Sequence, residues 1–136
     1  MLNAYSVGQT IAANDYISFN LVALRKGETA VLSGNSTVQL NKAGVYAVSF
    51  EITGTPAAAG AVTVEMLKDG VAQPQATATL PAALTTVSVA LPITTLVQVQ
   101  HDNGPCCCRA PVVLQFRNTG VGLNNAGVRL VITKVC

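Results

Sequence analysis

The residues best suited to chemistry lie in one short stretch, HDNGPCCCRA, at positions 101–110. This stretch holds the only histidine of the chain and three of its four cysteines. Imidazole and thiolate groups bind zinc and other soft metals, and they also serve as bases and nucleophiles. The candidates for a site in this loop are His101, Asp102, Cys106, Cys107, Cys108 and Arg109, and Cys136 adds a fourth thiol.

The spacing of the cysteines argues against a metal site within one chain. Successive side chains of an extended segment point to opposite faces, so three adjacent thiols do not converge on one ion. Structural zinc sites use pairs such as Cys-x-x-Cys with a second pair at a distance, and this sequence has no such pattern. One alternative requires three copies of the chain, because one cysteine repeated about a threefold axis would form a thiolate ring for a soft metal.

Two further interpretations of the thiols stay open. A disulfide could join the cluster to Cys136, because both segments could approach each other in a closed sandwich and four cysteines permit such pairing. Free thiols on a proline-flanked loop are the other interpretation, which folding inside a cell would favour. His101 and Asp102, which precede Asn103-Gly104, then belong to a polar turn between two strands.

No catalytic constellation accompanies this stretch. No serine occupies the glycine-flanked turn that exposes a catalytic nucleophile. The acidic residues are dispersed, and we expect Glu51 and Glu65 on solvated strand faces. The glycine-rich stretches at 33–36 and 120–125 lack the Gly-Lys-Ser/Thr sequence that cradles phosphate. We therefore predict that the protein is not an enzyme and uses no cofactor.

The composition favours association and excludes several partners. Charged residues make up only 10% of the chain, against about 25% in a typical soluble protein. A surface with so little charge is poorly protected against association, which favours burial between subunits. The net charge of +2 comes from scattered residues without interleaved aromatics, so we predict no nucleic-acid partner. No apolar run is long enough to span a membrane, and MLNAYSVGQT lacks the pattern of a secretory signal, so no membrane insertion is expected.

Turn residues and alternating apolar residues indicate an all-β protein. The clearest strand is GVYAVSFEIT, at positions 44–53, which alternates apolar with small or polar side chains. Its apolar face consists of Tyr46, Val48, Phe50 and Ile52. Such a face is typical of a strand that covers a core on one side. The dipeptide Asp69-Gly70 predicts a tight hairpin, since glycine accepts the positive φ that this turn requires.

The same reasoning predicts about ten strands in a single domain covering residues 1–136. We expect an N-terminal arm over residues 1–15 and a sandwich over residues 16–136. The predicted strands lie at residues 17–24, 30–32, 37–40, 44–53, 62–68, 76–80, 86–91, 96–100, 112–117 and 128–134. The stretch GTPAAAGA is predicted to be a loop, because proline and the flanking glycines leave too little room for a helix.

Three segments occur in an order that resembles a known fold: LNKAGVYAVSFEIT, VTVEMLKDGVA and NNAGVRLVITKV. Over residues 17–135 the chain resembles the jelly roll of tumour necrosis factor (TNF) and the complement globular head. The most similar variety is bacterial, as in the head of collagen-like spore-exosporium glycoproteins and in related prophage-encoded proteins. One departure is that LPITTLVQVQHDNGPCCC replaces the usual Leu-Gly-Asp turn, which leaves the late loops unassigned.

The resemblance implies a ten-stranded antiparallel jelly-roll sandwich that forms a homotrimer, in agreement with the low charge. Inward side chains of two strands are candidates for the core and the trimer seam, two roles that the pattern does not separate. These residues are Tyr46, Val48, Phe50, Ile52, Val128, Leu130 and Ile132.

The leading hypothesis for function is a structural or attachment head on a phage particle or on a bacterial spore or cell surface. Its partners would be further copies of itself and a host-surface protein or glycan. One alternative is a soluble lectin-like or receptor-binding protein with its specificity in loops. Another is a thiol or metal protein that uses Cys106–Cys108.

Overall fold

The computed structural model describes residues 1–26, 30–83, 87–99 and 112–135, which form ten β-strands and no helix. In this part of the chain there is accordingly no helix that could cross a membrane. The strands are β1 (Leu2–Ile11), β2 (Leu21–Arg25), β3 (Ala30–Ser33), β4 (Thr37–Leu40), β5 (Gly44–Pro56), β6 (Gly60–Lys68), β7 (Val71–Ala83), β8 (Val89–Val99), β9 (Val112–Asn118) and β10 (Leu123–Lys134).

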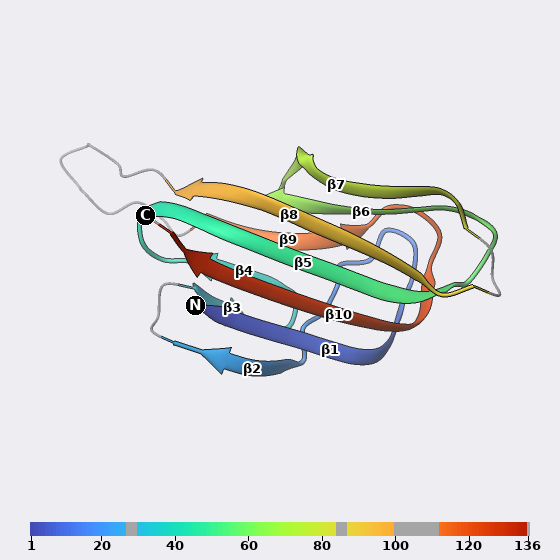
Figure 1. The fold of residues 1–136 in the computed structure, drawn as a ribbon, viewed down its shortest axis with the longest axis horizontal. Helices are drawn as coiled ribbons and strands as arrows, with labels where there is room; N and C mark the ends of the chain where they lie inside the picture. The colour runs from blue at the N-terminus through green and yellow to red at the C-terminus, as the bar shows by residue number, and fades with distance from the viewer. Residues whose placement is uncertain (27–29, 84–86, 100–111, 136) are drawn as a thin grey trace.

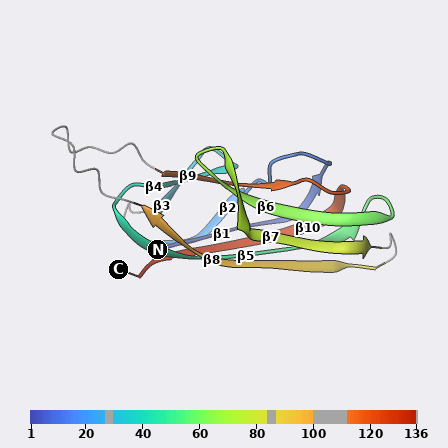
Figure 2. The ribbon, with the colours of Figure 1, turned by 90° about the horizontal axis from the view of Figure 1, so that it is seen from above.

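The strands form two five-stranded antiparallel sheets that pack face to face (Figures 1 and 2). The first sheet has the order β2-β1-β10-β5-β8, and the second has the order β3-β4-β9-β6-β7. The first and last strands of the chain, β1 and β10, are neighbours in the first sheet, with Leu2 opposite Ile132. The fold is thus an all-β, ten-stranded jelly-roll sandwich, as the sequence predicts.

Alternating side chains from both sheets fill the space between them. Three phenylalanines form the centre of this core. Phe50 of β5 and Phe116 of β9 stack with their ring centroids 4.3 Å apart, and Phe19 lies edge-on to both. Because the stacked rings come from different sheets, they hold the two layers together. Burial of each ring contributes about 1.5–3 kcal/mol.

The seven residues proposed for the core or the trimer seam all lie inside one chain. Each is between 0% and 4% exposed and belongs to the hydrophobic core. They are Tyr46, Val48, Phe50, Ile52, Val128, Leu130 and Ile132. Their side chains are buried between the sheets, so a subunit contact on these strands would rest mainly on the alternate, outward residues.

The predicted hairpin is confirmed. Lys68 pairs with Val71 across a two-residue turn, in which Asp69 has φ 51° and Gly70 has φ 83°. Two positive φ angles in a two-residue turn give the backbone the twist of the flanking strands, which glycine and aspartate accept more readily than β-branched residues. The strands predicted around β3, β4, β5, β6, β7, β9 and β10 are also present, with shifted or extended ends.

The N-terminal segment differs from the expected arm over residues 1–15. Residues Leu2–Ile11 form β1, which lies inside the first sheet between β2 and β10. The alternation of buried and exposed side chains along β1 is interrupted after Ser6. At this point the register of β1 against β10 shifts between Ser6 and Gln9, and Gly8 has φ 70°. This β-bulge moves the side chains that follow it out of the simple period of two.

Two other predicted boundaries are wrong. The strand expected at residues 17–24 begins only at Leu21, because Ile17 and Phe19 enter the core from a segment whose backbone bonds to Phe116 and Asn35. The strands expected at 86–91 and 96–100 form the single strand β8 within the described residues. Pro92 does not interrupt β8. This strand lies at the edge of the sheet, so its backbone forms ladder hydrogen bonds on one side only, and the missing N–H of proline is tolerated.

Candidate functional site

The loop site predicted from the sequence lies outside the described residues. This applies to His101, Asp102, Cys106, Cys107, Cys108, Arg109 and Cys136. Among the residues that the structure does describe, no group of three or more His, Cys, Asp or Glu side chains could hold a metal ion. The disulfide, thiolate-ring and free-thiol interpretations therefore stay predictions.

The surface that stands out in the described chain is the outer face of the first sheet. Its side chains point away from the core, because they alternate with buried residues on β1, β5, β8 and β10. The ladder registers place on this face Asn3, Tyr5, Leu21, Leu24, Ala47, Ser49, Glu51, Thr53, Ala90, Pro92, Thr94, Leu96, Gly127, Arg129, Val131 and Thr133. Only two of these residues are charged, Glu51 and Arg129.

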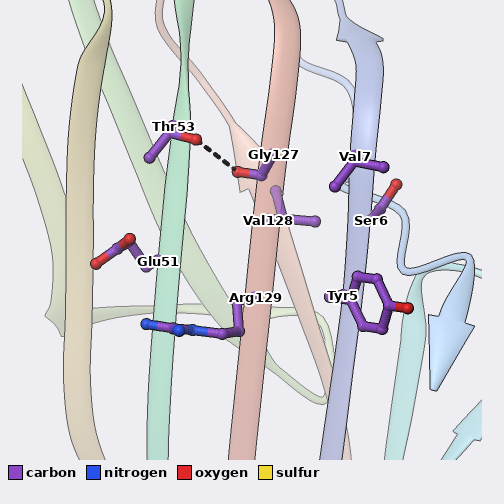
Figure 3. Close-up of a pocket in the computed structure, with 8 residues that line it drawn as sticks. All are labelled: Tyr5, Ser6, Val7, Glu51, Thr53, Gly127, Val128 and Arg129. Carbon is purple, nitrogen blue, oxygen red and sulfur yellow. Dashed lines mark hydrogen bonds between the residues drawn. The ribbon is translucent and has the colours of Figure 1, made fainter. Parts of the chain in front are cut away.

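Arg129 and Glu51 lie directly opposite each other on β10 and β5, yet they do not form an ion pair. Both residues are exposed, and neither side chain has a hydrogen-bond partner among the described residues. Figure 3 shows the Arg129 side chain extending from β10 toward β5, while the Glu51 carboxylate extends from β5 toward β8. Neither charge is therefore neutralised by another side chain of the described residues.

A hollow of about 270 Å³ lies beside these charges on the same face. It is lined by Tyr5, Ser6, Val7, Glu51, Thr53, Gly127, Val128 and Arg129 (Figure 3). The floor of the hollow depends on Gly127: a Cβ there would stand 3.2 Å from Thr53 Oγ1. The Thr53 hydroxyl donates a long hydrogen bond of 3.4 Å to the Gly127 carbonyl.

Two irregularities in the ladders shape this region. The β1–β10 register shifts between Ser6 and Gln9, and the β10–β5 register shifts between Asn124 and Gly127. In the second bulge, Asn125 has φ 51°, a left-handed conformation that asparagine tolerates better than most residues. Both bulges lie next to the hollow, where they interrupt the regular rows of side chains.

The outer face of the second sheet also carries an arginine opposite a glutamate, and these two side chains are in contact. Arg117 of β9 lies opposite Glu65 of β6, and its guanidinium Nη2 donates to Glu65 Oε1 at 2.7 Å. The two side chains are 33% and 15% exposed. Threonine and glutamine side chains on this face also bond to each other, as in Thr63 with Thr79 and Gln115 with Thr37. The named polar side chains on this face therefore bond mostly to one another, although Arg117 Nε is buried without a hydrogen-bond partner among the described residues.

The buried Tyr46 is a structural residue. Its hydroxyl donates to the Lys42 carbonyl at 2.7 Å. Burial raises the pKa of this phenol above its usual value, and the hydrogen bond to Lys42 partly offsets that rise. Tyr46 therefore stays neutral at physiological pH and closes the end of β5 against the preceding loop.

The whole described chain matches solved jelly-roll structures. PRD1 vertex protein P5 superimposes with a TM-score of 0.67 at 18% identity, over 99% of this chain and 96% of that one. The globular domain of zebrafish complement 1qA superimposes with a TM-score of 0.72 at 8% identity, over 99% and 96% of the two chains. The Eiger TNF of S. frugiperda gives a TM-score of 0.69 at 12% identity, over 99% and 92%.

The chain has a TNF-like jelly-roll fold. These identities establish the fold, and no protein-family model or curated protein matches the sequence. The resemblance to TNF and the complement globular head is therefore confirmed at the level of the fold.

The open charge pair on this TNF-like sandwich was missed by sequence reasoning, which placed Glu51 on an ordinary solvated face. The alternation predicts that Glu51 points outward. It does not tell which strand lies next to β5, so it cannot place Arg129 opposite. A charged residue within the apolar segment GVRLVI was the available signal.

Proposed function

We propose that this protein is a non-enzymatic, homotrimeric head module that acts in structure or attachment on a phage particle or on a bacterial spore or cell surface. The observation that carries the proposal is the TNF-like fold over 99% of the chain, shared with a protein named as a vertex protein. A sandwich of this kind is a compact, rigid body that presents loops at its ends, which suits a terminal module of a larger particle.

The outer face of the first sheet supports self-association. It combines small side chains such as Ala47 and Ser49 with exposed Leu21, Leu24 and Leu96. Leu21 and Leu24 lie on the edge strand β2 and Leu96 lies on the opposite edge strand β8, so both edges of this weakly charged face present apolar side chains to a neighbouring copy. Cyclic association about a threefold axis would bury the face in every copy, which accounts for the low charge of the chain.

Attachment is the second part of the proposal. The partner is a host-surface protein or a glycan, bound by loops that the sandwich presents. His101, Asp102 and Arg109 stay the sequence-based candidates for this contact. A partner of this class fits a non-enzymatic role, because binding needs no nucleophile or general base.

Light scattering coupled to size-exclusion chromatography tests the assembly. At micromolar concentration we expect a particle of three times the chain mass of 14.0 kDa. A stable monomer would contradict the proposed homotrimer and, with it, the proposed head module.

A glycan array and binding to intact host cells test attachment with the trimer so obtained. The matched variants are His101→Ala with Asp102→Ala in the candidate loop, and Thr77→Ala with Thr79→Ala on the outer face of the second sheet. Loss of binding in the first variant alone is the expected result. The absence of binding to every glycan and cell tested would limit the protein to an architectural role.

A further inference from the structure

We propose that Arg129 and Glu51 form ion pairs between copies of the chain, Arg129 of one copy with Glu51 of the next. This inference rests on the proposed homotrimer and names the charges that orient its subunits. The outer face of the first sheet is thereby assigned as the interface between copies. The occupant of the hollow beside Arg129 is a second copy of this chain.

The first argument is the state of the two charges. Arg129 and Glu51 stand opposite each other in the β10–β5 ladder, and both side chains lack a partner among the described residues. A direct cross-strand position brings Cβ atoms within about 5 Å, a distance at which long side chains can meet. The chain demonstrates such closure at Arg117 and Glu65, 2.7 Å apart in the second sheet. The first pair stays open and can serve an external group.

The second argument is the surroundings of the pair. The other residues on the outer face of the first sheet are uncharged, and Leu21, Leu24 and Leu96 are exposed on its flanks. A partner that covers these apolar side chains would also remove Arg129 and Glu51 from water. Burying either charge without a counter-charge is strongly unfavourable, so the covering surface must present both an acid and a base.

The third argument is that a ring of copies satisfies both charges. About a threefold axis, Arg129 of each copy can meet Glu51 of the next copy while its own Glu51 meets Arg129 of the previous one, so every charge has an opposite partner. A partner with only acidic or only basic groups would satisfy one charge and repel the other. Among partners of stated chemistry, a second copy of this chain therefore matches the described charges best.

The hollow supplies the room for this contact. Gly127 and the two β-bulges leave about 270 Å³ beside the Arg129 side chain, with Tyr5 on the far wall. A side chain from a neighbouring copy could enter there and approach the guanidinium from outside. The rim groups Thr53 and Glu51 add acceptors for the donors of an incoming arginine.

Cross-linking between two different single variants tests the pairing directly. In a background where Cys106, Cys107, Cys108 and Cys136 are replaced by serine, one chain carries Glu51→Cys and another carries Arg129→Cys. The chains are refolded together and exposed to oxidised glutathione, which accepts the electrons as the disulfide forms. We expect a covalent dimer that requires both variants and that disappears on reduction.

The matched control is a mixture of Thr63→Cys and Thr79→Cys chains. These residues are also cross-strand neighbours, but they belong to the outer face of the second sheet. The control mixture should give at least tenfold less covalent dimer, as should each variant alone. Equal yields in test and control mixtures would indicate random collision and would overturn the inference.

Charge reversal in the natural cysteine background gives a second measurement. Arg129→Glu and Glu51→Arg should each weaken association by about 30-fold or more, because each leaves like charges together in the interface. The double variant, with the two charges exchanged, should regain most of the lost affinity. A double variant that associates as weakly as the single ones would contradict the pairing.

The outcomes separate this inference from the proposed function. A wild-type trimer without the 51–129 cross-link and without rescue by charge exchange overturns the ion pairs and leaves the trimeric head standing. A wild-type monomer overturns both. A trimer with the cross-link and the rescue supports both.

Discussion

The two outer faces of the sandwich each place one arginine opposite one glutamate, and they use the pair differently. On the second sheet, Arg117 and Glu65 are in contact at 2.7 Å and partly buried. On the first sheet, Arg129 and Glu51 occupy the same ladder relation, yet both stay exposed and separate.

The difference shows that strand register alone does not make an ion pair. Near Arg117, Tyr16 forms a β-bridge that adds backbone beside the end of β9, and the Arg117 and Glu65 side chains are only 33% and 15% exposed. Lower solvent exposure strengthens the attraction between the charges. Near Arg129, Gly127 and the bulges leave open space, so the side chain stays solvated. The second face is closed on itself, and the first face is open to a partner.

The largest expected effect concerns the core that both faces share. Phe50→Ala removes the ring that stacks on Phe116 and should lower the free energy of unfolding by about 3–5 kcal/mol. Urea unfolding followed by circular dichroism measures this value. The exposed Val71→Ala is the control and should change it by less than about 0.5 kcal/mol. Similar losses in both variants would mean that the phenylalanine stack does not join the sheets.

The second prediction compares how much each outer face contributes to association between copies of the chain. Leu96 on the first sheet and Val71 on the second are 64% and 63% exposed, so a lysine fits either position in the monomer. Leu96→Lys should weaken trimer formation by about tenfold or more, because it buries a charge in the interface. Val71→Lys should leave association unchanged. Analytical ultracentrifugation over a dilution series measures both, and equal effects would erase the distinction between the faces.

The third prediction separates the closed pair from the open one. Glu65→Gln weakens a contact inside the chain and should lower the free energy of unfolding by about 1 kcal/mol, a value already reduced for solvent screening. This loss should be the same at every protein concentration. Glu51→Gln should instead act through association, so its effect should grow with protein concentration. Thermal unfolding at several concentrations distinguishes these two behaviours.

The smallest effect concerns Tyr46, on the inner side of the first sheet. Tyr46→Phe removes the hydrogen bond to Lys42 and should cost about 1 kcal/mol below pH 10. The pKa of this phenol is raised in the folded state, so the wild type loses stability as the pH rises above the unfolded value of about 10. The variant lacks this loss, and the two stabilities should converge at alkaline pH. A constant difference between pH 8 and pH 11 would contradict the raised pKa.

The parts of the fold that could be predicted are those governed by local pattern. The alternation in β5 identifies its inward side chains, and Asp69-Gly70 identifies the turn between β6 and β7. Both signals depend only on residues next to each other in the chain. They therefore suffice for the all-β class and for most strand positions, whereas the jelly-roll arrangement was predicted from the resemblance to TNF and the complement globular head.

The parts that escaped prediction depend on distant neighbours. The sequence predicts an arm over residues 1–15, whereas Leu2–Ile11 form β1 by pairing with β2 and β10, with a bulge at Gly8 that interrupts the alternation. The sequence predicts two strands at residues 86–91 and 96–100, whereas β8 continues through Pro92, which is tolerated because this strand lies at the edge of the sheet. The open pair of Glu51 and Arg129 joins residues far apart in sequence, so no local pattern could have revealed it.

The pairing of β1 with β10 has a consequence for how the chain is made. Within this domain, β1 is synthesised before the other nine described strands, whereas its neighbour β10 is synthesised after them. Until β10 emerges, β1 can pair only with β2, and a lone two-stranded ribbon is barely stable in water. The first sheet therefore cannot be completed until β10 has been synthesised, so its central pairing is a late, non-local step of folding.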